Sequence, residues 1–92
     1  MQFEWDEAKN RSNYQKHGLW FEEAQTLWAD AHSVEFFDPS SESEDRFIRV
    51  GHSSAARVLL VVFCERQDGG IIRIISARKA TKKERQQYEE GI

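Results

Sequence analysis

Positively charged side chains crowd one short stretch of a chain whose net charge is −3. Six of the thirteen residues from 73 to 85 are Lys or Arg, namely Arg73, Arg78, Lys79, Lys82, Lys83 and Arg85. Fixed guanidinium and ammonium groups stabilise the negative charge that develops on a phosphate during its reactions. The stretch therefore predicts an anion site, although exposure at the start of a helix is the simpler explanation for Lys82 and Lys83.

A histidine beside a lysine elsewhere adds a group that can act as a base or an acid. Lys16 and His17 stand at the predicted end of a helix, where the helix dipole favours a protonated imidazole. Such a set suits metal-free RNA cleavage, in which the 2′-hydroxyl attacks the neighbouring phosphate with help from a base and an acid. A helix-end cap without chemistry stays open for His17, as do surface ion pairs with the acidic residues for Arg46 and Arg78.

Other common chemistries lack their residues. His17, His32 and His52 lack the paired spacings of zinc ligands, and the single Cys64 cannot form a thiolate cluster. Gly69-Gly70 is not followed by Lys-Ser/Thr, so the sequence has no phosphate-binding glycine loop. A serine nucleophile is equally unsupported. We expect neither a metal nor a cofactor.

The helices that position these groups have recognisable ends. Asp6 suits the N-cap of a helix over 7–17, and Gly18 suits its left-handed C-terminal position. A second helix over 21–29 carries an apolar face. Thr81-Lys82-Lys83-Glu84 predicts a capping box at the start of a third helix. The first helix carries one polar stripe, which solvent exposure explains and which a site could also use: Lys9, Asn13, Lys16 and His17.

Apolar residues in alternation predict the strands, which cover residues 3–5, 33–38, 46–51, 58–63 and 71–78. The strand over 46–51 has Arg46, Ile48 and Val50 on one face and Phe47 and Arg49 on the other. Asp68-Gly69 predicts a hairpin turn. We expect an α+β fold with an antiparallel sheet of four to five strands, two N-terminal helices and one C-terminal helix.

Length and charge are consistent with one small domain over residues 1–92. Residues 1–45 hold eleven Asp and Glu against three Lys and Arg, whereas residues 46–92 hold five against ten. The basic half is the natural place for an anion site. Nothing resembles a signal peptide or a membrane span, so we expect a cytoplasmic protein. Cys64 lies in an apolar run and is expected to be a buried structural thiol.

A WD…K…N…KHG opening and an ISAR…ER ending form a specific combination that covers nearly the whole chain. It comprises Trp5-Asp6, Lys9, Asn13, Lys16-His17-Gly18, Phe21-Glu22-Glu23-Ala24, Arg46, Gly51, Ile75-Ser76-Ala77-Arg78, Ala80, Glu84-Arg85 and Tyr88. With these residues the chain resembles the BrnT family of bacterial toxins. Trp20 departs from the pattern, because the family often has there a small polar residue that can cap the second helix.

The resemblance implies a RelE-like fold and a toxin that cleaves RNA without a metal and so inhibits translation in a type II toxin-antitoxin system. It implies a BrnA-like antitoxin with a ribbon-helix-helix part, in a 2:2 complex that binds operator DNA only through the antitoxin. Carried onto matching positions, the expected catalytic residues are Lys16, His17, Arg46 and Arg78. The positive charge of four further residues makes them expected RNA contacts, independently of the resemblance: Arg49, Arg73, Lys79 and Arg85. Tyr88 is expected to pack its helix.

A second class of function stays open. The basic face could hold an acidic partner or nucleic acid without cleaving it. RNA bound in this way would dissociate as salt rises, with a log–log slope of about −0.7 per phosphate contact, and would yield no fragments. A DNA-binding regulator acting alone is disfavoured by the net charge and by the lack of a helix-turn-helix pattern.

Overall fold

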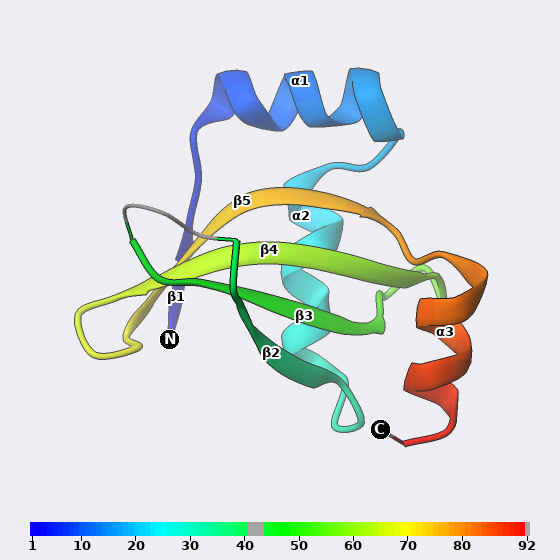
Figure 1. The fold of residues 1–92 in the computed structure, drawn as a ribbon. Coiled ribbons are helices and arrows are strands. Elements are labelled where there is room, and N and C mark those ends of the chain that lie inside the picture. Colours follow the sequence, from blue (N-terminus) through cyan, green and yellow to red (C-terminus); the bar gives the residue numbers. More distant parts are fainter. Residues whose placement is uncertain (41–43, 92) are drawn as a thin grey trace.

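A single twisted sheet organises the chain in the computed structural model, which describes residues 1–40 and 44–91 (Figure 1). Its five strands run in the order β1-β5-β4-β3-β2. They are β1 (Gln2–Glu4), β2 (Val34–Asp38), β3 (Arg46–His52), β4 (Val58–Arg66) and β5 (Ile71–Lys79). The helical segments are α1 (Glu7–His17), α2 (Phe21–Ala24), the 3₁₀ helix η1 (Gln25–Ala29) and α3 (Lys82–Glu89). The α+β fold expected from the sequence is confirmed.

The sheet is mixed, and the expectation of an antiparallel sheet is wrong at one edge. β2, β3, β4 and β5 are antiparallel neighbours, but β1 pairs in parallel with β5, with Gln2 opposite Ile71. Hairpin turns dictate direction only for strands that are consecutive in the chain. Because nearly the whole chain separates β1 from β5, no turn pattern could have shown their relative direction.

The predicted helix ends are confirmed. The side chain of Asp6 accepts hydrogen bonds from the backbone of Ala8 and Lys9, and Gly18 ends α1 with φ of 70°. Thr81 and Glu84 form both halves of the capping box of α3. The expected single helix over 21–29 instead tightens into η1 at its second half, where the Thr26 hydroxyl donates to the Glu23 carbonyl oxygen at 2.6 Å. Such side-chain bonds compete with the backbone pattern of an α-helix.

The two faces of the sheet are covered unequally. The main core lies on the face under α2 and η1, where Leu19, Phe21 and Leu27 pack against the strand residues Leu59 and Phe63. A smaller cluster on the other face joins Val50 and Leu60 to Tyr88 of α3. Cys64 is buried as expected, and burial raises the pKa of its thiol. No helix of the described residues is long and apolar enough to span a membrane.

α1 is attached to the rest of the fold by polar groups. Its buried residues are Asn10 and Asn13, so Asn13 does not belong to an exposed polar stripe. Asn10 accepts a hydrogen bond from the backbone N–H of Phe21 at 2.7 Å and donates one to Glu22. Trp20 provides no side-chain cap for α2 and instead stacks on Tyr14. Asn10 thus accepts a hydrogen bond from a backbone N–H at the start of α2, where the side chain of Trp20 accepts none.

Candidate active site

The last turn of α1 lies beside the end of β5. Lys16 and His17 form this turn, and both side chains are exposed. Asn13 fastens the helix through hydrogen bonds to the backbone of Ala77. His17 follows Asn13 by one turn, about 6 Å along the helix axis. The chain therefore places Lys16 and His17 near the end of β5.

Arg78 is held in a two-pronged ion pair. Its two terminal nitrogens donate to the two carboxylate oxygens of Glu84, each at 2.9 Å. The hydrogen bond from Arg78 lowers the pKa of Glu84 to about 2 and raises that of Arg78. Glu84 also caps α3, so Arg78 joins the end of β5 to the start of that helix. The ion pair orients the guanidinium of Arg78, so this residue has a structural role in addition to any chemical role.

Three other predicted cations lie away from this corner. Arg46 lies on the same face of the sheet as Arg78. Four residues along the strand and two strands across the sheet separate them, which corresponds to roughly 16 Å for standard strand spacings. Arg73 pairs with Glu4 at 2.7 Å near the start of β5. Arg49 lies on the opposite face, where it pairs with Glu35 at 2.7 Å and covers the ring of Trp28. The structure does not bring these three to the end of β5.

Lys79 and Arg85 line one hollow of about 480 Å³. It lies between the end of β5, α3 and the turn that joins β3 to β4, and its wall also contains His52, Arg57 and Glu89. Arg57 is paired with Glu23, whose pKa this hydrogen bond lowers. Within the described residues, the side chains of Lys79 and Arg85 form no hydrogen bond or ion pair. The hollow is therefore a place where a phosphate can bind.

A chain of hydrogen bonds leads from this hollow to a partly buried carboxylate. His52 Nδ1 lies 3.0 Å from the Tyr88 hydroxyl, which donates to Asp30 Oδ2 at 2.5 Å. Burial of Asp30 opposes its ionisation, but hydrogen bonds from Tyr88 and from the backbone of His52 and His32 outweigh it and lower its pKa. Burial and then Asp30 raise the pKa of Tyr88 to about 12. Sequence reasoning missed this group, because its three members are far apart in the chain.

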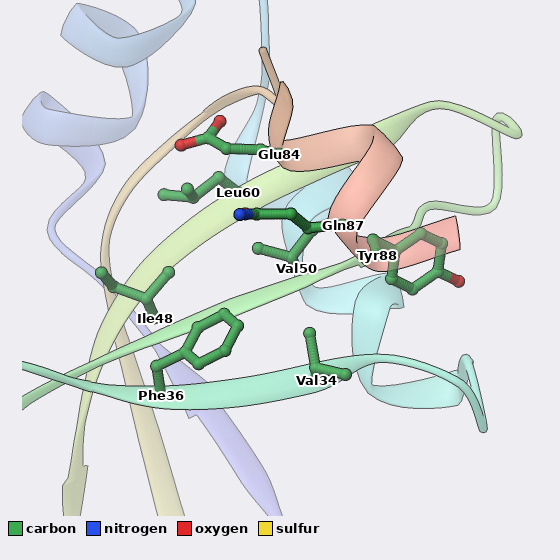
Figure 2. A pocket seen from close by; sticks show the side chains of 8 residues that line it. All are labelled: Val34, Phe36, Ile48, Val50, Leu60, Glu84, Gln87 and Tyr88. Atoms are coloured by element: carbon green, nitrogen blue, oxygen red, sulfur yellow. The ribbon is translucent and has the colours of Figure 1, made fainter. Parts of the chain in front are cut away.

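An apolar groove lies on the sheet face beneath α3 (Figure 2). Val34, Phe36, Ile48, Val50 and Leu60 line it, and its volume is about 330 Å³. Glu84, Gln87 and Tyr88 of α3 complete it, with the Tyr88 hydroxyl pointing away from the apolar side chains. The groove suits an apolar side chain or the face of a base. In the described part of the chain, no group of three or more His, Cys, Asp or Glu is placed to hold a metal ion.

Fold and sequence together define the class of protein. The sequence model described as "Ribonuclease toxin, BrnT, of type II toxin-antitoxin system" matches residues 5–84, so the chain belongs to this family of ribonuclease toxins. The crystal structure of the Brucella abortus ribonuclease toxin BrnT, solved at 1.1 Å resolution, has the same fold, with a TM-score of 0.65. The two chains are 24% identical, and the match covers 89% of this chain and 99% of the other. No curated protein matches the sequence.

Proposed function

We propose that the chain is an endoribonuclease that cleaves RNA without a metal ion and so inhibits translation. Its family consists of ribonuclease toxins. The observation that carries the mechanism is the gathering of cations at the end of β5, where Arg78 and Lys79 lie near Arg85 of α3. Cations in that position stabilise the charge that builds on a phosphate when the 2′-hydroxyl attacks it.

The residues expected to be catalytic divide between two places in this proposal. In it, Lys16, His17 and Arg78, near the end of β5, act on the scissile phosphate. Arg46 stands roughly 16 Å from Arg78 on the same face and holds a flanking phosphate. The face between the two arginines includes the apolar groove, which can receive an unstacked base.

The partner of the toxin is an antitoxin, since the family belongs to type II toxin-antitoxin systems. We propose a BrnA-like protein with a ribbon-helix-helix part, bound as a 2:2 complex in the cytoplasm. Operator DNA is bound by the antitoxin. The net charge of −3 supports this division of labour, because a net-acidic toxin is a poor general DNA binder.

Cleavage is tested by incubating the purified chain with total RNA in excess EDTA and mapping the fragment ends. The expected products carry 2′,3′-cyclic phosphate or 3′-phosphate ends, and Arg78→Ala and His17→Ala should lose most of the activity. Arg78→Ala also breaks the ion pair with Glu84, so Glu84→Gln serves as its control by breaking the pair while keeping the arginine. Equal loss in both variants would assign the effect to the ion pair.

A well-folded wild-type chain that produces no fragments, also with ribosomes present, would refute the proposal. Binding of RNA without cleavage, weakened by salt, would then identify a binding module. The mass of the complex co-purified with the antitoxin tests the 2:2 stoichiometry separately.

A further inference from the structure

The imidazole of His52 is hydrogen-bonded to the hydroxyl of Tyr88, which is itself hydrogen-bonded to Asp30. The hydroxyl of Tyr88 has one proton to donate. The ionised carboxylate of Asp30 can accept hydrogen bonds but cannot donate one. The 2.5 Å contact between Tyr88 Oη and Asp30 Oδ2 therefore uses that proton. Tyr88 is left with lone pairs, so the 3.0 Å contact to His52 Nδ1 requires a proton on Nδ1. In the neutral imidazole this leaves Nε2 as the basic nitrogen.

The same imidazole lines the cationic hollow. Lys79 and Arg85 stand in its wall with Arg57, opposed by the single carboxylate of Glu89. Arg57 is paired with Glu23, which also attracts Lys79 without a hydrogen bond, so Lys79 and Arg85 keep their hydrogen-bond donors for a phosphate. A histidine with an oriented basic nitrogen thus borders a site for a phosphodiester. The arrangement follows the general pattern in which a third group orients the base.

We propose that His52 is the general base of RNA cleavage, with Tyr88 and Asp30 as positioning residues and with Lys79 and Arg85 as ligands of the scissile phosphate. This inference rests on the proposed function and names the site at which it occurs. His17 has no such support, because within the described residues no hydrogen bond orients its exposed side chain. In the proposed function His17 therefore contacts the scissile phosphate, and His52 takes the proton of the 2′-hydroxyl.

The step balances as a transesterification. Nε2 of His52 takes the proton of the 2′-hydroxyl, and the 2′ oxygen forms a bond to phosphorus. The bond from phosphorus to the 5′ oxygen breaks, and its electron pair stays on that oxygen. The leaving oxygen takes a proton from solvent, and His52 later returns one to solvent. The products are a 2′,3′-cyclic phosphate and a 5′-hydroxyl.

The kinetic test compares His52→Gln with His32→Gln, a matched change at an exposed histidine outside the hollow that holds Lys79 and Arg85. We expect His52→Gln to lower kcat by about 100-fold or more, as loss of a general base does, and His32→Gln to keep the wild-type rate. Wild-type activity in His52→Gln, beside an active wild-type chain, would overturn the inference and leave the proposed function standing.

A second measurement does not depend on cleavage. In ¹⁵N NMR spectra of the wild type we expect the Nδ1–H tautomer of neutral His52, and in Tyr88→Phe we expect that preference to be lost. A single-stranded oligonucleotide with 2′-deoxy sugars, which cannot be cleaved by this route, should shift the His52 imidazole signals. Lys79→Ala and Arg85→Ala should weaken its binding.

These outcomes separate the two proposals. If the wild type cleaves no RNA, the proposed function fails, and the NMR titration still tests the site. An Nε2–H tautomer in the wild type, or unchanged His52 signals on addition of the oligonucleotide, would overturn the assignment of His52.

Discussion

The side-chain amide of Asn13 pairs with both backbone groups of Ala77. Its Oδ1 accepts from the Ala77 N–H at 3.1 Å, and its Nδ2 donates to the Ala77 carbonyl oxygen at 2.9 Å. The same Nδ2 donates to the Leu19 carbonyl oxygen at 2.9 Å. β1 covers β5 only at residues 71–73, so the edge of β5 would otherwise be unpaired at Ala77. One amide therefore replaces a stretch of missing strand and fixes α1 to the sheet.

Replacing Asn13 by alanine should destabilise the fold. The change removes all three hydrogen bonds and leaves the backbone groups of the buried Ala77 without partners. Each buried unsatisfied group costs about 1–3 kcal/mol, so we expect the free energy of unfolding to fall by roughly 2–4 kcal/mol. Urea unfolding followed by circular dichroism measures it. Ser12→Ala, an exposed change on the same helix, is the control, and equal stabilities of the two variants would contradict this role of Asn13.

The predictions that held were those that depend on neighbouring residues. Asp6, Gly18 and the Thr81–Glu84 capping box act within one helical turn, so their spacing in the sequence determines their contacts. The Asn13–Ala77 pair joins residues 64 positions apart. A polar residue on a helix has the same pattern whether it faces water or a strand edge, and the sequence could not distinguish the two.

The candidate site shows the same limit. Charge density drew attention to the end of β5, because Arg78 and Lys79 follow each other in the chain. It could not show that Arg49 is paired with the carboxylate of Glu35. Charge density also could not identify His52, because its contact with Tyr88, and through Tyr88 with Asp30, depends on the packing of α3 against β3.

Substitution of Arg49 should affect the stability of the fold, whereas substitution of Lys79 should affect RNA binding. Arg49 donates to Ser33 at 2.6 Å and to Glu35 at 2.7 Å, and it lies over Trp28 on the face away from Arg78. We expect Arg49→Ala to lower the free energy of unfolding by roughly 1–3 kcal/mol and to leave RNA affinity unchanged.

Lys79→Ala is the complementary change. Its exposed side chain has no hydrogen bond or ion pair among the described residues, so stability should change by less than about 0.5 kcal/mol. RNA affinity should fall, and the log–log salt slope should become shallower by about 0.7, the value for one phosphate contact. Fluorescence anisotropy at several salt concentrations measures both quantities. A steeper loss of affinity in Arg49→Ala than in Lys79→Ala would reverse the two roles.

Glu84 should make the fold sensitive to acid. Its pKa in the folded chain is about 2, below its ordinary value of 4.5, chiefly because Arg78 donates to it. A lowered pKa stabilises the fold above pH 4.5, and this contribution is lost as the pH falls from about 4.5 towards 2. After allowance for solvent screening we expect it to be roughly 1–2 kcal/mol.

The variant Glu84→Gln should be less stable than the wild type at pH 7 and should approach it in stability near pH 2. Thermal or urea unfolding at several pH values measures this convergence. Glu65→Gln, at an exposed carboxylate outside the ion pairs of the described residues, should follow the wild-type curve. A constant difference between Glu84→Gln and the wild type across this pH range would show that ionisation of Glu84 is not the cause.

Gly51 keeps Asp30 in reach of Tyr88 because it has no side chain. A Cβ at this position would lie 2.7 Å from Cβ of Ser33 and 3.0 Å from Oδ2 of Asp30, the oxygen that accepts from Tyr88. Gly51→Ala must therefore displace the chain around Asp30, and overpacking of this kind costs about 1–3 kcal/mol. We expect this loss in urea unfolding, together with loss of the Nδ1–H signature of His52 in ¹⁵N spectra.

A second substitution tests the cause of that loss. Ser33→Gly removes the closer of the two contacts, so the double variant should be more stable than the value expected from adding the two single effects. Additive losses would place the strain elsewhere. A Gly51→Ala chain with wild-type stability and an unchanged His52 tautomer would show that Asp30 does not need the space that the glycine leaves.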